Sequence, residues 1–291
     1  MPSSNGPLSI TDPVAEARRR RSTWILAVVA ALTVLVPFLF WKQTWFGQPL
    51  TDEQITEYLA DQERPRHRQQ ALVQIQQRIE RGDASAARWY PQMAALKDSP
   101  VVELRVTLAW VMGTDYRSEL FHQALLEMLE DADLLPRRNA ALSLVRFGDA
   151  AGREEIVRML QPYAVHASQA GLLRYRLQEG NAVDGGTLLA RLENQDGSTA
   201  EIRSPLPGKL LRRIAAEGAS VRAGEEIAVL GPGEDHVWEA LRALLLIGRS
   251  EDLPLVESFA RTSEAAYSAR IREQAALTAA EIRKRESEQR Q

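Results

Sequence analysis

Hydrophobic residues follow helical spacing over two stretches of this chain, 51–163 and 234–286. Apolar positions recur every three or four residues, which predicts amphipathic helices of about 12 to 18 residues. Short turn signals separate the helices of the first stretch, at 81–83, 97–100, 112–115, 135–136 and 147–149. Because these loops are short, the sequence predicts pairs of antiparallel helices.

The predicted helix pairs repeat along the chain. Residues 99–113 have a counterpart in 135–148, with Pro100 and Pro136 about 36 residues apart. Weaker echoes occur at 64–72, 236–248 and 268–277. Proline at a helix start, small alanines in mid-helix and glycine at the end resemble HEAT repeats. An irregular helical bundle is the alternative.

Between the helical stretches, residues 168–232 contain the same half-motif twice. The stretches 171–193 and 208–230 align so that Glu179-Gly180 falls on Glu217-Gly218. Each half has short apolar and basic runs of strand length, interrupted by glycines. We expect these glycines at turns that need a positive φ or lack room for a Cβ.

This doubled stretch resembles the biotinyl/lipoyl domain, a barrel-sandwich hybrid of two quasi-symmetric halves, and the match includes 203–209. Carrier members of that family have an acceptor lysine at the central hairpin tip. Here the tip holds Asp196 and Gly197, and Lys209 does not match the acceptor position. The resemblance therefore implies a module without cofactor, as in periplasmic adaptor (membrane fusion) proteins.

The spacing of the helical motifs predicts that the β module is an insertion. Gly148 and Gly248 lie about 100 residues apart, against a repeat of about 36, and the excess matches the doubled stretch. The expected fold is mainly α with an inserted all-β module, that is, a HEAT-like solenoid, a barrel-sandwich hybrid and one transmembrane helix. The expected organisation is a disordered tail (1–21), a transmembrane helix (22–42), helical repeats (51–163), the β module (166–232) and further repeats (234–286).

The amino-terminal region has the pattern of a membrane anchor. Residues 24–41 carry no charge, which is near the shortest length that spans a bilayer. The flanking anchor residues are Arg18, Arg19, Arg20, Arg21, Trp24, Trp41 and Trp45. A buried helix of a soluble domain and a cleaved signal peptide are the alternatives. The arginines place the amino end in the cytoplasm, so the rest of the chain is expected outside the inner membrane, in the periplasm.

Composition narrows the chemistry. The net charge of −3 does not favour a nucleic-acid partner, and the absence of cysteine excludes disulfides and thiolate metal sites. The four histidines are scattered, although His166 and His236, at the two ends of the β module, could meet. The adjacent acids Glu154-Glu155, Glu225-Glu226 and Glu234-Asp235 are expected to be solvated, and Trp110 and Trp238 to be core residues. We therefore expect no catalytic site and no metal site.

These observations favour a membrane-anchored scaffold or adaptor that binds other envelope proteins, in a transport or secretion assembly. Asn194, Gln195 and Asp196 form the candidate docking tip. Adaptors carry a long coiled-coil hairpin between the two halves of the barrel, and this chain has only 194–199 there. The alternatives are a carrier or accessory subunit of an enzyme complex, and a solute-binding or sensory ectodomain. The sequence leaves the identity of any small-molecule ligand unknown.

Overall fold

The structure is a computed structural model that describes residues 32, 33, 35, 49–194, 197–263 and 266–290. It divides into two compact units, Met1–Thr51 and Asp52–Gln291. The expected tail, and the expected transmembrane helix apart from 32, 33 and 35, lie outside the described residues, as do the flanking arginines and tryptophans. Within the described residues, we find no helix with the length and apolar character needed to cross a bilayer.

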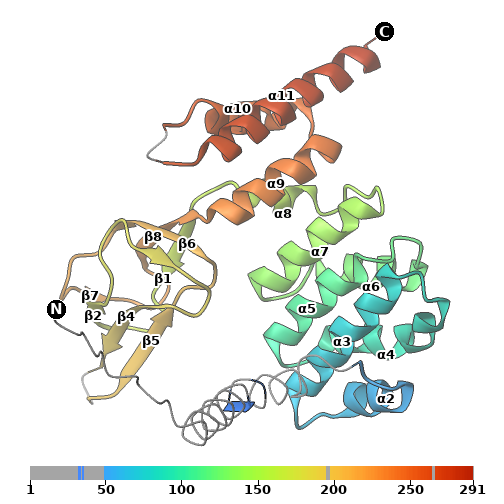
Figure 1. Cartoon of the computed structure of the whole chain (residues 1–291). Coiled ribbons are helices and arrows are strands. Elements are labelled where there is room, and N and C mark those ends of the chain that lie inside the picture. Colours follow the sequence, from blue (N-terminus) through green and yellow to red (C-terminus); the bar gives the residue numbers. More distant parts are fainter. Residues whose placement is uncertain (1–31, 34, 36–48, 195–196, 264–265, 291) are drawn as a thin grey trace, which may run out of the picture. The chain divides into compact units, whose positions relative to one another are not determined.

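The larger unit begins with helices that pack as antiparallel pairs (Figure 1). They are α2 (Asp52–Ala60), α3 (Pro65–Glu80), η1 (Ala84–Trp89), α4 (Tyr90–Ala94), η2 (Ala95–Asp98), α5 (Val102–Met112), α6 (Glu119–Met128), α7 (Leu134–Arg146) and α8 (Arg153–Arg158). Proline begins α3 and lies in the first turn of α7, where its missing N–H sacrifices no helical bond. The turns predicted at 81–83 and 147–149 fall between helices, and those at 97–100 and 112–115 overlap a helix end. The turn predicted at 135–136 was wrong, because both residues lie in the first turn of α7.

Helices resume after the β strands. They are α9 (Glu234–Ile247), η3 (Ser250–Asp252), α10 (Leu253–Ala260) and α11 (Ala269–Gln289). Alternate helices form one continuous series, in which α3 contacts α5, α5 contacts α7, α7 contacts α9 and α9 contacts α11. One apolar cluster contains Ile156 and Leu160 from before the strands together with Val237 and Leu241 from after them. The helices on both sides of the strands thus share a core.

The inserted segment forms two small antiparallel sheets (Figure 1). Its strands are β1 (Tyr163–His166), β2 (Gly171–Tyr175), β3 (Ala182–Val183), β4 (Leu188–Glu193), β5 (Thr199–Arg203), β6 (Gly208–Arg213), β7 (Ser220–Val221) and β8 (Glu226–Pro232). The first sheet has the order β1-β8-β6-β3 and the second β5-β4-β2-β7. The first strand begins at Tyr163, ahead of the expected start at 166, because it pairs with β8.

The two sheets are copies of each other. Exchanging β1–β4 with β5–β8 converts the order of one sheet into that of the other. Each sheet therefore takes two strands from the first half of the module, β1–β4, and two from the second half, β5–β8. Both sheets bury side chains in one shared apolar core, which includes Leu173, Leu192, Leu210 and Leu230. A half-motif alone would leave its share of this core exposed.

Hydrogen bonds repeat the same exchange. The Gly180 amide donates to Leu210 and the Gly218 amide to Leu173. In the same way, the carboxylate of Glu217 accepts from the Tyr175 amide, and that of Glu179 accepts from the Arg213 amide. The predicted turn glycines have positive φ, as Gly180 at 89° and Gly218 at 76° illustrate. The repeat in the sequence thus corresponds to a quasi-two-fold repeat of hydrogen bonds in the structure.

Candidate functional site

A ladder of side-chain hydrogen bonds and ion pairs links the successive helical hairpins α3–α4, α5–α6, α7–α8 and α9–α10. In each rung, a residue near the start of the second helix of one hairpin bonds an aspartate in the turn of the next hairpin. The rungs are Tyr90 to Asp115 at 2.7 Å, His122 to Asp149 at 2.7 Å, and Arg153 to Asp252 at 2.9 and 2.6 Å. Each aspartate also accepts a hydrogen bond from a nearby backbone N–H. One side chain therefore stabilises its own turn and also connects that turn to the preceding hairpin.

The third rung spans the β module. Arg153 and Asp252 are separated by 99 residues, and Arg153 bonds both oxygens of the carboxylate. Only 11% of the Arg153 side chain and 4% of the Asp252 side chain are exposed. A buried bidentate ion pair fixes both the position and the orientation of its two partners. The α9–α10 hairpin, which follows the module, is therefore attached to the preceding hairpin in the same way as the earlier hairpins are.

A second set of bonds links the first helices of the hairpins. The Ser143 hydroxyl donates to the Ala109 carbonyl of α5, and the Thr278 hydroxyl donates to the Leu241 carbonyl of α9, each at 2.8 Å. Both hydroxyls are buried between two helices. The same hydroxyl-to-carbonyl hydrogen bond between neighbouring helices therefore occurs before and after the inserted sheets.

A buried charge cluster lies where the chain leaves the helices for β1. Glu155 is 5% exposed and accepts from Arg137 at 3.2 Å and from Arg138 at 3.3 Å. The prediction of a solvated Glu155 was wrong, because α7 packs over α8 and supplies both arginines. Burial lowers the pKa of Arg138, and the charge of Glu155 opposes that effect.

His236 lies in the first turn of α9, close to the buried Arg138. Burial lowers its pKa and the charge of Arg138 lowers it further, while Asp235 acts in the opposite direction. Its Nδ1 is buried and has no hydrogen-bond partner among the described residues. His166 is exposed on β1, and no contact between the two histidines is found among the described residues.

Three cavities follow one another along the loops that join the hairpins. Their volumes are about 500, 360 and 260 Å³, and each contains the arginine at the fourth position of a first helix, namely Arg68 of α3, Arg105 of α5 and Arg137 of α7. Residues of two successive loops, together with the adjoining helices, line each of the first two cavities. The cavities are thus a repeated feature of the hairpin array.

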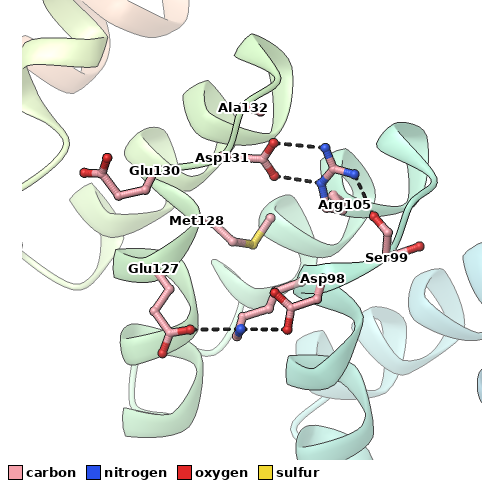
Figure 2. A pocket seen from close by; sticks show the side chains of 9 residues that line it. Asp98, Ser99, Arg105, Glu127, Met128, Glu130, Asp131 and Ala132 are labelled. Atoms are coloured by element: carbon pink, nitrogen blue, oxygen red, sulfur yellow. Dashed lines mark hydrogen bonds and ion pairs between the residues drawn. The ribbon is translucent and has the colours of Figure 1, made fainter.

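Ion pairs line the middle cavity (Figure 2). Arg105 bonds both oxygens of Asp131, at 2.7 and 2.9 Å, and donates to the Ser99 carbonyl at 2.6 Å. Lys97 lies between Asp98 and Glu127, at 2.8 and 2.9 Å. Burial acts to raise the pKa of Asp131, but the bonds from Arg105 and a backbone amide outweigh it, so this pKa is lowered.

The expected docking tip is described only in part. Gln195 and Asp196 lie outside the described residues. Asn194 accepts from Gln169 at 3.0 Å and donates to the Ser198 hydroxyl at 2.8 Å, and the Gly197 amide donates to the Asn194 carbonyl. Gly197 has a φ of 82°, as expected at a hairpin tip.

Lys209 and two tryptophans were also singled out in the sequence. Lys209 lies within β6, opposite Ala182 and Gly231, and so does not occupy the hairpin tip, as expected. Trp110 was wrongly predicted as a core residue: it is 45% exposed, because its direction on α5 is not covered by another helix. Trp238 is partly buried, with Arg242 and Arg270 at 4.4 and 3.7 Å from its ring centre.

The described residues contain no group of three or more histidines, aspartates or glutamates placed to hold a metal ion. The sequence reasoning missed the arginine cavities and the bond ladder. Arginine at the start of a helix and aspartate after a glycine turn were visible signals, but their pairing depends on which hairpins pack together.

Comparisons with known proteins find little similarity to this chain. No protein-family model matches the sequence, and no curated protein matches it. Among solved structures, one match is a single-chain, multi-domain long-chain acyl-CoA carboxylase, at 20% identity and a TM-score of 0.24. The match covers 44% of this chain and 14% of the carboxylase chain. A likeness of this size carries no argument about the fold or the function.

Proposed function

We propose that this chain is a non-enzymatic, membrane-anchored scaffold that binds other envelope proteins outside the cytoplasm. In this proposal the helical hairpins are a HEAT-like solenoid, and the paired sheets are a barrel-sandwich hybrid without cofactor. The described residues offer extended surfaces and polar cavities rather than a convergent catalytic constellation. A role in a transport or secretion assembly is part of the proposal.

The observation that carries the proposal is the continuity of the bond ladder across the insertion. Arg153 and Asp252 join the hairpins before and after the sheets, and β1 pairs with β8 where the chain leaves and re-enters the helices. A module held by two paired strands and a common helical core is positioned rather than loosely tethered. Preorganised surfaces bind with a smaller loss of conformational entropy, which suits a docking platform.

The quasi-two-fold pattern supports the choice of the β4–β5 hairpin as the proposed docking tip. The β4–β5 hairpin is related by that pattern to the β8 and β1 ends, where the module joins the helices. The end of the β4–β5 hairpin is therefore the symmetry-related counterpart of the end at which the module joins the helices. This position leaves the Asn194 end of the hairpin for contact with another protein.

Site-specific photo-crosslinking tests the docking tip. A photoreactive amino acid at Asp196 is expected to give adducts of discrete mass with other membrane or envelope proteins in living cells. The same amino acid at Gln178, an exposed turn residue of the same module, is the matched control. A chain that gives no adduct from position 196, and that purifies alone from detergent, contradicts the scaffold proposal.

Reporter fusions test the anchor and its orientation. Alkaline phosphatase fused after residue 290 is expected to be active, because the segment after the anchor lies outside the cytoplasm in this proposal. Removal of residues 22–42 is expected to abolish the phosphatase activity and to release the chain from the membrane fraction. An inactive phosphatase fusion on the membrane-bound full chain contradicts the orientation.

A further inference from the structure

Among the residues that the structure describes, Arg68 differs from the other two cavity arginines in having no acidic partner. Arg105 pairs with Asp131 and Arg137 pairs with Glu155, both over 2.7 to 3.2 Å. Arg68 makes one bond, from Nη2 to the Ala60 carbonyl at 3.5 Å, and its Nε is buried without a partner. A buried N–H without an acceptor is unfavourable, so this donor is available to an acceptor from outside the chain.

The loops before the first helices explain the difference. One residue in each loop accepts the amide of the second residue after it: Asp61 from Glu63, Ser99 from Val101, and Asp131 from Asp133. Arg105 bonds the residue at this position in the following loop, which is Asp131. For Arg68 the corresponding residue is Ser99, which also lines the Arg68 cavity. Serine has no carboxylate, so the position of the acid is vacant.

The surroundings of Arg68 are suited to an external carboxylate. The cavity of about 500 Å³ is lined by Gln62, Gln92, Leu59, Leu96 and Pro100, among others. Its one carboxylate belongs to Asp98, which is held by Lys97 at 2.8 Å. The positive charge of Arg68 is therefore unbalanced there, and two amide side chains are at hand to donate hydrogen bonds.

We propose that the Arg68 cavity binds a carboxylate group from outside the chain, in the place that Asp131 occupies beside Arg105. The planar guanidinium offers Nε and an Nη in the geometry that fits the two oxygens of a carboxylate. An acidic side chain of a partner protein and a free organic acid present the same group. The proposal does not depend on the scaffold function, since either source fills the cavity.

Nuclear magnetic resonance of the full chain in detergent, with ¹⁵N-labelled arginine, tests this directly. The Arg68 Nε–Hε signal, identified by its loss in Arg68→Gln, is expected to shift saturably with sodium acetate or with N-acetyl-aspartate N-methylamide. Tighter binding of the aspartate derivative identifies a partner side chain, and tighter binding of acetate identifies a free acid. No saturable shift with either probe, or an equal shift with sodium chloride at the same ionic strength, overturns the proposal.

Two variants complete the test. Ser99→Asp supplies the carboxylate from within the chain, so it is expected to displace the Arg68 signal without any probe and to weaken probe binding by about tenfold or more. Arg66→Gln removes the same charge from an exposed position on the same helix and is expected to leave probe binding unchanged. Unchanged probe binding in Ser99→Asp, or equal losses in Arg66→Gln and Arg68→Gln, refutes the assignment.

Discussion

Replacement of Arg153 by methionine tests whether the helical array is continuous through the inserted sheets. Methionine retains the unbranched apolar stem and removes the guanidinium. Asp252 then loses both of its bonds to the side chain, at 2.9 and 2.6 Å, and keeps only the bond from the Arg249 amide. A carboxylate that is 4% exposed is left without its counter-charge.

The expected cost follows from the burial of this pair. Removal of one partner from a buried ion pair destabilises a protein by about 3–5 kcal/mol, because the remaining charge stays away from water. Both side chains are nearly inaccessible, so solvent screening does not reduce this value. The additional pair between Arg153 and Glu251 adds about 0–1 kcal/mol, because Glu251 is 66% exposed.

Hydrogen exchange locates the effect. In Arg153→Met, the slowest amides of α9 and α10 are expected to exchange faster by a factor that corresponds to about 3–5 kcal/mol. Arg158→Met makes the same substitution in the same short helix, at a side chain that is 59% exposed, and is expected to change exchange by less than about 1 kcal/mol. A double variant with Asp252→Asn should lose less than the sum of the two single losses.

Equal exchange in the Arg153→Met and Arg158→Met proteins would refute this reasoning. It would mean that the rung across the insertion adds nothing to the packing of the later hairpins. The helices on the two sides of the β module would then be joined by their shared apolar core rather than by the bond ladder. The ladder would no longer support a fixed position for the module.

Three further outcomes are expected. Glu155→Gln removes the negative charge between Arg137 and Arg138 and should lower the free energy of unfolding by about 3–5 kcal/mol in urea titrations, so wild-type stability would contradict the buried cluster. His236 has a lowered pKa in the folded chain, so the unfolded chain binds a proton there more readily. The free energy of unfolding should therefore fall as pH drops below 6.5. In urea titrations across pH, His236→Gln should show a weaker dependence of this free energy on pH. An equal slope in the variant would show that other groups control it. Gly208→Ala would place a Cβ 2.1 Å from a backbone oxygen of the facing strand, and should lower the melting temperature and speed amide exchange in both sheets; unchanged exchange would contradict the close approach.

Local features of this fold could be predicted from the sequence because they depend on neighbouring residues. The turn glycines of the doubled motif, such as Gly180 and Gly218, have positive φ for a reason that lies in their own backbone. The helix starts at Pro65 and near Pro136 follow from the missing N–H of proline. The spacing of these signals was enough to identify helix pairs and an inserted β segment.

Burial and charge pairing could not be predicted, because they depend on which elements meet. Trp110 lies on an apolar helix and is nevertheless exposed, whereas Glu155 stands next to another glutamate and is nevertheless buried between arginines. The sheets also mix strands from both halves, so neither half contains its own core. These outcomes arise from contacts between residues far apart in the chain.

The sequence by itself thus determined the helix pairs, the doubled β motif and the absence of lysine at its central tip. Only the tertiary structure decided that Arg153 reaches Asp252 across the module, and that Arg68 has no acid where Arg105 has one. The physical reason is that turn and helix signals act through the local backbone. The partner of a charged side chain, by contrast, is set by the packing of distant helices.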